Sequence, residues 1–147
     1  MKYTKEEVKD YIEQEDVKFI RLAFCDKNGK LKNISISPTE IDRAFSEGIS
    51  FDAYAIDGFG SNPTTDLVLH PIPSTLNVLP WRPSHGKVVR MFCNIKYPDG
   101  KPFEIDTSQI LQHAVKAAKE MGLNVMIGPE YEFYLFKNDE NGDKTDA

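Results

Sequence analysis

The sequence predicts an α+β fold, and three observations indicate it. Two strand-like runs, residues 17–24 and 31–36, flank an Asn-Gly pair, which a tight β-hairpin turn favours. Two helical patterns, beginning at Thr4 and Ser37, have helix-capping residues before their apolar positions. Further short strand-like runs follow, so that helices and strands are mixed along the chain without a regular alternation.

The two helices of the first half begin at recognisable capping residues. Thr4 and Glu7 have the spacing of a capping box, which places the start of the first helix at Thr4. After the hairpin, Ser37 is the predicted N-cap of a second helix, with Pro38 at the first helical position. Gly48 stands just past the last apolar position and is predicted to end this helix.

The remaining strands of the first part come after an irregular segment. Residues 48–60 are small, apolar and aromatic, with two acids and no clear period, so we predict an ordered loop there. Short strands are predicted at residues 66–70 and 76–79, and a central strand at residues 88–95. A hairpin, a helix lying on the sheet and further strands are the element order of a β-grasp-like domain.

The C-terminal part of the chain has a different organisation. We assign residues 1–103 to the β-grasp-like domain and residues 104–147 to the beginning of a second domain. In the second part, Asp106 or Thr107 caps a third helix, and a long strand is predicted from residue 123 to residue 136. One helix cannot bury both faces of such a strand, so we expect a larger domain that is truncated here.

The composition argues against several classes of protein. Apolar residues make up 40% of the chain and aromatic residues 11%, which is enough for a hydrophobic core. The net charge is −5 with acids and bases interspersed, so no basic stripe indicates nucleic-acid binding. No apolar run approaches the roughly 20 residues that span a membrane. We predict a cytoplasmic protein in which Cys25 and Cys93 are reduced, with a disulfide between them as the less favoured alternative.

Two carboxylates stand out in the predicted C-terminal strand. Side chains alternate along a strand, so Glu130 and Glu132 share one face with Tyr134 and Phe136. Like charges that are desolvated this close together need a cation or a proton. Oxygen ligands of this kind suit a hard divalent metal such as Mg²⁺ or Mn²⁺. The alternative is a sheet end at which both carboxylates reach water, and the pattern alone leaves both interpretations open.

Several segments, in order and spaced over nearly the whole chain, carry a family resemblance. They are Val17-Lys18-Phe19-Ile20-Arg21-Leu22 with its hairpin, Phe51-Asp52 followed by Ile56-Asp57-Gly58-Phe59, Asp66-Leu67-Val68-Leu69-His70-Pro71, Tyr97-Pro98-Asp99-Gly100-Lys101-Pro102-Phe103 and Gly128-Pro129-Glu130-Tyr131-Glu132-Phe133. Together they resemble the N-terminal part of a prokaryotic-type glutamine synthetase. The resemblance implies a β-grasp N-terminal domain followed by the first helix and strand of the catalytic domain.

The resemblance also implies an activity and roles for three residues. Members of the family are ATP-dependent glutamate–ammonia ligases, which form γ-glutamyl phosphate from ATP and glutamate before ammonia attacks it. By this resemblance Glu130 would bind a divalent metal on the nucleotide side and Glu132 a second one on the glutamate side. Asp52 matches the aspartate that reaches the neighbouring subunit's site and helps to deprotonate ammonium; a turn or capping role is its alternative. The family's double-layered rings imply a homo-oligomer, a double-ring dodecamer.

The chain departs from the family pattern directly after Asp52. The family usually has Asp-Gly-Ser-Ser-Ile, whereas this chain has Asp52-Ala53-Tyr54-Ala55-Ile56. Ala55 lacks the hydroxyl that would contact a small cation, and Tyr54 adds an aromatic face that attracts ammonium groups. A γ-glutamyl ligase for another amine, of polyamine or ethanolamine type, is therefore an alternative. Ser61 stands where one branch of the family has an Arg linked to feedback inhibition, so we expect no such regulation.

A third hypothesis belongs to a different class of protein. A non-catalytic relative would use the β-grasp domain for assembly or regulation, and it would lack the acidic, His and Arg residues that an enzyme needs further along the chain. The enzyme hypotheses place those ligands further along the chain than residue 147, so we expect residues 1–147 to be inactive alone. His70 and His85 have no second metal ligand at a matching spacing, and we expect a core or interface role for them.

Overall fold

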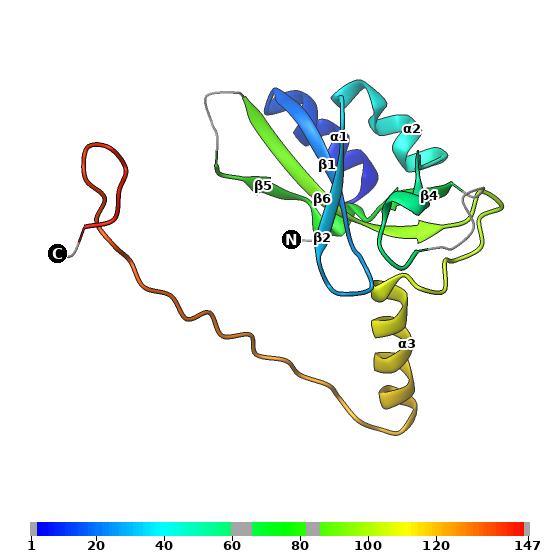
Figure 1. The fold of residues 1–147 in the computed structure, drawn as a ribbon. Helices are drawn as coiled ribbons and strands as arrows, with labels where there is room; N and C mark the ends of the chain where they lie inside the picture. Colours follow the sequence, from blue (N-terminus) through cyan, green and yellow to red (C-terminus); the bar gives the residue numbers. More distant parts are fainter. Residues whose placement is uncertain (1–2, 60–65, 82–85, 146–147) are drawn as a thin grey trace.

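The centre of the fold is a six-stranded mixed sheet in the order β2-β1-β6-β4-β3, with β5 paired to β6 outside this path (Figure 1). The computed structural model describes residues 3–59, 66–81 and 86–145. The strands are β1 Val17–Cys25, β2 Leu31–Ile36, β3 Ile49–Phe51, β4 Leu67–Pro71, β5 Asn77–Leu79 and β6 Lys87–Lys96. The mixture of these strands with helices confirms the predicted α+β class.

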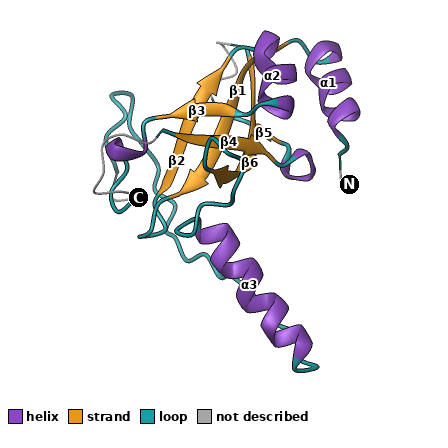
Figure 2. Ribbon diagram, turned by 90° about the vertical axis from the view of Figure 1, so that its right-hand side faces the viewer, coloured by secondary structure: helices purple, strands orange, loops and turns teal. Residues whose placement is uncertain are grey.

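The helices divide into a pair on the sheet and one that leaves it. Figure 2 shows α1 and α2 next to each other on one side of the sheet and α3 extending away from it. Their bounds are α1 Lys5–Gln14, α2 Ile41–Ser46 and α3 Thr107–Glu120, with 3₁₀ turns η1 Pro38–Glu40, η2 Ala53–Ala55 and η3 Pro73–Thr75. None of the helices in the described ranges is long and apolar enough to cross a membrane.

The start of α1 and the β1–β2 hairpin form as the sequence predicts. The hydroxyl of Thr4 accepts the backbone N–H of Glu7 at 3.2 Å, and the Glu7 carboxylate accepts the backbone N–H of Thr4 at 2.7 Å. The hairpin pairs β1 with β2 antiparallel, from Ile20 opposite Ile36 to Cys25 opposite Leu31. These two local signals therefore specified both the position and the type of the elements.

Strand β6 is the element around which the sheet is arranged. It pairs parallel with β1 and antiparallel with β4 and β5. Pro71 lies opposite Cys93, and Asn77 lies opposite Arg90, so β4 and β5 follow one another along β6. The 3₁₀ turn η3 interrupts them, because Pro73 cannot donate a hydrogen bond to a sheet.

The core lies between the sheet and the helix pair and continues into an aromatic row. Side chains of α1, α2, β1 and β6 fill it, among them Val8, Ile12, Ala44, Phe45, Ile20, Leu22, Val89 and Met91. The ring of Phe24 lies 5.0 Å from that of Phe51 and 5.9 Å from that of Phe59. Phe59 in turn lies 5.1 Å from Phe103. The row joins β1 to the segment after β3 and to the residues that precede α3.

One local prediction in the first 60 residues was wrong, and another was confirmed in part. Residues 48–60 were predicted as a loop, but the described part of this segment contains β3 and η2, because Ile49 and Phe51 find pairing partners in β4. Ser37 is the N-cap of the helical segment, with Pro38 next to it as predicted, but its side chain makes no capping hydrogen bond. The chain instead forms η1 first, and α2 begins at Ile41.

The predicted strand from Leu123 to Phe136 is also wrong, although the preceding helix forms. Asp106 is the N-cap of α3, and Gly122 ends the helix with a φ of 76°. The following residues form no strand and run as an extended chain away from the sheet (Figure 1). A strand needs a neighbour for its backbone N–H and C=O groups, and none of the described strands pairs with this segment.

Candidate functional site

Asp52 lies at the surface between β3 and η2. Its Oδ1 accepts the backbone N–H of Tyr54 at 2.9 Å, so that it caps the 3₁₀ turn. Phe51 and Ala53, on either side of it, are buried, whereas the Asp52 side chain is exposed. The structure thus shows the capping role that the sequence left as an alternative. The cap uses Oδ1 and leaves the carboxylate facing solvent, so capping does not prevent a second role.

The residues that depart from the family pattern lie in the same exposed turn. Tyr54 is 63% exposed, and its backbone N–H donates the hydrogen bond that Asp52 accepts. Ala55 is exposed as well, and Ile56 is partly buried against the core. An acid and an aromatic ring are therefore presented together to solvent, which is a combination that attracts organic cations.

Glu130 and Glu132 lie in the extended segment that follows α3, and both are exposed. Their aromatic neighbours are exposed too, with Tyr131 at 85% and Phe133 at 73%. The desolvation that would require a cation is therefore not present at this pair. Two carboxylates two residues apart have the donor chemistry that a hard divalent metal prefers. Even so, the described residues contain no cluster of three or more His, Cys, Asp or Glu side chains that would complete such a site.

The structure does not bring the three predicted site residues together. Asp52 lies between β3 of the sheet and η2, whereas the segment containing Glu130 and Glu132 runs apart from the sheet (Figure 1). Asp52 is held by β3 and η2, while no described strand pairs with the segment of the two glutamates. Only one of the three predicted site residues therefore occupies a position defined by the surrounding fold.

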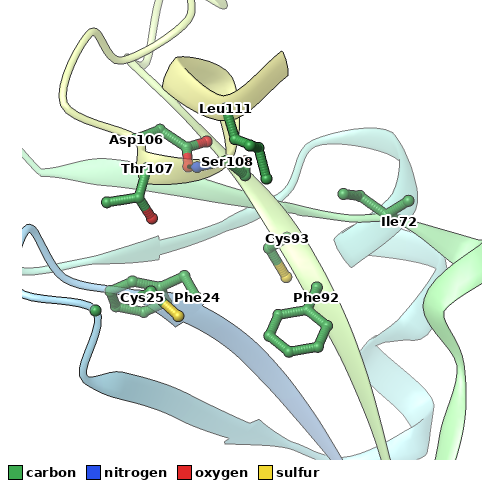
Figure 3. A pocket seen from close by; sticks show the side chains of 10 residues that line it. Phe24, Cys25, Ile72, Phe92, Cys93, Asp106, Thr107, Ser108 and Leu111 are labelled. Atoms are coloured by element: carbon green, nitrogen blue, oxygen red, sulfur yellow. Dashed lines mark hydrogen bonds between the residues drawn. The ribbon is translucent and has the colours of Figure 1, made fainter. Parts of the chain in front are cut away.

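An open cavity of about 370 Å³ lies where the start of α3 meets the sheet (Figure 3). Its walls come from β1 and the hairpin turn after it, β6, the residue that follows β4, and the start of α3. The lining residues are Phe24, Cys25, Gly29, Ile72, Phe92, Cys93, Asp106, Thr107, Ser108 and Leu111. The Asp106 carboxylate is buried and accepts the backbone N–H groups of Ser108 and Ile95, each at 2.9 Å. Sequence reasoning recognised Asp106 as a cap but missed its bond to β6, because that bond links positions that no local pattern connects.

The two cysteines line this cavity as free thiols, in agreement with the prediction. Cys93 is buried, and burial raises the pKa of its thiol to about 12. His70 is partly buried in β4, and burial, followed by the charges of Lys96 and Lys5, lowers its pKa. Partial burial is compatible with the expected core or interface role of His70; His85 and Ser61 lie outside the described residues.

Two consecutive parts of the chain match two domains of one protein family. The family described as "Glutamine synthetase, beta-Grasp domain" matches residues 16–98, and the one described as "Glutamine synthetase, catalytic domain" matches residues 104–147. The chain therefore belongs to the glutamine synthetase family. This finding confirms the β-grasp-like architecture and the family resemblance of the sequence.

Individual relatives agree with the family assignment. The chain is 43% identical over 144 residues to a glutamine synthetase of Clostridium saccharobutylicum, covering 98% of this chain and 32% of the relative. It is 42% identical over 142 residues to one of Methanosarcina mazei, covering 97% of this chain and 32% of the relative. The chain thus spans about a third of the length of these curated relatives.

Solved structures with the same fold include two forms of GmaS. The GmaS/ADP complex matches with a TM-score of 0.68 at 21% identity, covering 77% of this chain and 25% of that one. Ligand-free GmaS matches with the same TM-score and identity, covering 78% of this chain and 26% of that one. At this identity the likeness defines the fold and nothing further.

Proposed function

We propose that this chain supplies the N-terminal part of an ATP-dependent glutamate–ammonia ligase that makes glutamine through γ-glutamyl phosphate. The observation that carries the proposal is the 43% identity to a curated glutamine synthetase along 98% of the chain. Within the chain, residues 1–103 would form the β-grasp domain and residues 104–147 would open the catalytic domain. A cytoplasmic location and assembly into a double-ring dodecamer belong to the same proposal.

In this proposal Asp52 acts on the amine substrate. An exposed carboxylate attracts an ammonium ion and can accept its proton, which leaves the neutral amine as the nucleophile. The amine then attacks the carbonyl carbon of γ-glutamyl phosphate, the C–O bond to phosphate breaks, and phosphate leaves with the proton that the attacking nitrogen gives up. Asp52 is fixed by its turn, which suits a group that has to reach into the site of a neighbouring subunit.

Glu130 and Glu132 would bind Mg²⁺ or Mn²⁺ in a protein whose further catalytic-domain strands pair with their segment. When bound, such metals neutralise phosphate charge and orient the transferred group. Pairing would also bury the aromatic side chains around the two glutamates, which are exposed in this chain. The two carboxylates would then be removed from water and would need a cation to balance their charge.

Activity is testable in a protein that continues past residue 147 through the rest of the catalytic domain, here called the complete protein. We expect glutamate-dependent and amine-dependent ATP turnover that requires a divalent metal and is lost with Glu130→Ala or Glu132→Ala. Asp99→Ala, which removes an exposed turn carboxylate paired with Lys101, is the matched control and should retain activity. Residues 1–147 alone should be inactive, and metal-dependent ATP turnover by them would contradict the proposal.

A second candidate function is favoured by the exposed Tyr54 next to Asp52. On this hypothesis the complete protein joins glutamate to a larger amine, of polyamine or ethanolamine type, because an aromatic face stabilises an organic ammonium group. The GmaS structures share the fold and are compatible with either amine. A panel of ammonia, ethylamine, ethanolamine and polyamines decides between them, since equal or better turnover with ammonia would exclude the larger amine. No turnover with any amine would favour the non-catalytic relative.

A further inference from the structure

Residues 52–58, here called the Asp52 loop, are held against the turn of the β1–β2 hairpin. Asn28 donates through Nδ2 to Oδ2 of Asp57 at 3.0 Å, and Nζ of Lys27 lies 3.7 Å from Oδ1 of the same carboxylate. Two consecutive residues of one turn thus hold both oxygens of a carboxylate that lies 29 residues further along the chain.

Gly58 brings the loop and the turn into closer contact. Its φ of 82° lies in the left-handed region that favours glycine. A Cβ at this position would lie 2.0 Å from Cδ and 2.5 Å from Cε of Lys27. The aliphatic part of Lys27 therefore lies directly across the backbone of Gly58, while its ammonium group reaches Asp57.

Hydrogen bonds to Asp26 hold the hairpin turn that makes this contact. Asp26 is 1% exposed, and its Oδ1 accepts the backbone N–H groups of Asn28 and Lys30, each at 2.9 Å. Its Oδ2 lies 3.7 Å from Nζ of Lys32. These bonds fix the backbone of the turn that carries Lys27 and Asn28. The two side chains that contact Asp57 therefore start from a backbone that is held in place.

The other end of the loop is fastened as well. Phe51 is buried directly before Asp52, Ala53 is buried between Asp52 and Tyr54, and Phe59 is buried after the loop against Phe24 and Phe103. The exposed residues Asp52 and Tyr54 thus span a short stretch between two fixed points. Movement of the C-terminal fixed point would be transmitted to the turn that orients the Asp52 carboxylate.

We propose that Lys27, Asn28 and Asp57, together called the hairpin clamp, are positioning residues that hold the Asp52 loop ready for the amine. The inference rests on the proposed function for its consequence in catalysis, because it takes Asp52 as the group that meets the amine. An exposed ion pair contributes little to global stability, so the clamp acts on the position of the loop. A displaced carboxylate attracts an ammonium ion less strongly, because the attraction between opposite charges falls with their separation, so the amine is the substrate whose binding senses the clamp.

Amide hydrogen exchange of the 147-residue chain tests the clamp directly. Asp57→Ala should speed exchange at Tyr54, whose N–H is bonded to Asp52, and at Ile56, whose N–H is bonded to Ala53, by roughly tenfold. Asp42→Ala is the matched control, since it breaks the Lys9–Asp42 pair between α1 and α2, where the two side chains are 43% and 75% exposed. The values for the Lys27–Asp57 pair are 47% and 71%. Equal exchange at these amides in Asp57→Ala and unmodified chains would overturn the clamp.

Kinetics of the complete protein test its role in positioning. Asp57→Ala should raise the KM for the amine roughly tenfold, while the KM for glutamate and the kcat change less than about twofold. Asp57→Asn should recover part of the loss, because its amide oxygen still accepts the bond from Asn28. An unchanged amine KM, or equal losses for both substrates, would overturn the positioning role. No amine-dependent turnover in the unmodified protein would instead refute the proposed function, and the exchange experiment would still decide whether the clamp exists.

Discussion

The sheet with the helices packed on it, here called the sheet domain, and the segment after α3 both contain large apolar residues. These side chains are buried in the sheet domain and exposed in the segment. Ile20, Leu22 and Val89 of the sheet are 0% exposed, whereas Tyr134 and Leu135 of the C-terminal segment are 88% and 89% exposed. The difference lies in the availability of partners, because β1 and β6 pair with each other and no described strand pairs with residues 123–136. A strand-like pattern therefore states which side chains can be buried, and a neighbouring strand decides whether they are.

Limited proteolysis should show the largest difference between the two regions. Chymotrypsin is expected to cut the 147-residue chain after Tyr131, Phe133, Tyr134 or Phe136 about a thousandfold faster than within β1 or β6, since cutting the sheet requires it to open. Mass spectrometry of the first products measures this ratio. In the complete protein the same sites should become protected, and early cuts near Phe24 would contradict the contrast.

One substitution made in both regions should separate them in stability. Leu22→Ala removes a fully buried side chain and should lower the free energy of unfolding by about 3 kcal/mol. Leu135→Ala removes an 89% exposed side chain and should change it by less than about 0.5 kcal/mol. Urea unfolding followed by circular dichroism gives both values. Similar losses for the two variants would mean that the C-terminal segment packs in solution.

Local signals predicted the sheet domain better than the candidate site. The capping box at Thr4 and the Asn-Gly turn fixed α1 and the hairpin, because each depends on neighbours within a few residues. The wrong predictions have long-range causes: β3 exists because Ile49 finds Leu69, and residues 123–136 lack any such partner. Asp52 is a candidate only through the family resemblance, and the bond from Asn28 to Asp57 has no signal in a single sequence.

The junction between the two regions depends on Asp106. Its carboxylate caps α3 and accepts the buried N–H of Ile95 in β6, so it joins the helix to the sheet. Asp106→Ala leaves that N–H without a partner and should lower the free energy of unfolding by about 2 kcal/mol. Asp106→Asn, which keeps an acceptor oxygen, should lose less. Thermal unfolding measured for both variants tests this order, and equal stability of the Ala variant and the unmodified chain would contradict it.

The stability of the sheet domain should depend on pH through Asp26. Burial alone would raise the pKa of Asp26, but hydrogen bonds from the backbone of Lys30 and Asn28, with the charges of Lys32 and Lys30, hold it below its usual value of 3.8. A carboxyl whose folded pKa is depressed adds stability above its unfolded pKa, and that stability is lost as the pH falls through the folded pKa. Asp26→Asn should therefore be less stable than the unmodified chain at neutral pH, and the gap should close below pH 3.8. Urea unfolding between pH 7 and pH 2.5 measures the gap, and a pH-independent gap would show that Asp26 stabilises the turn by shape alone.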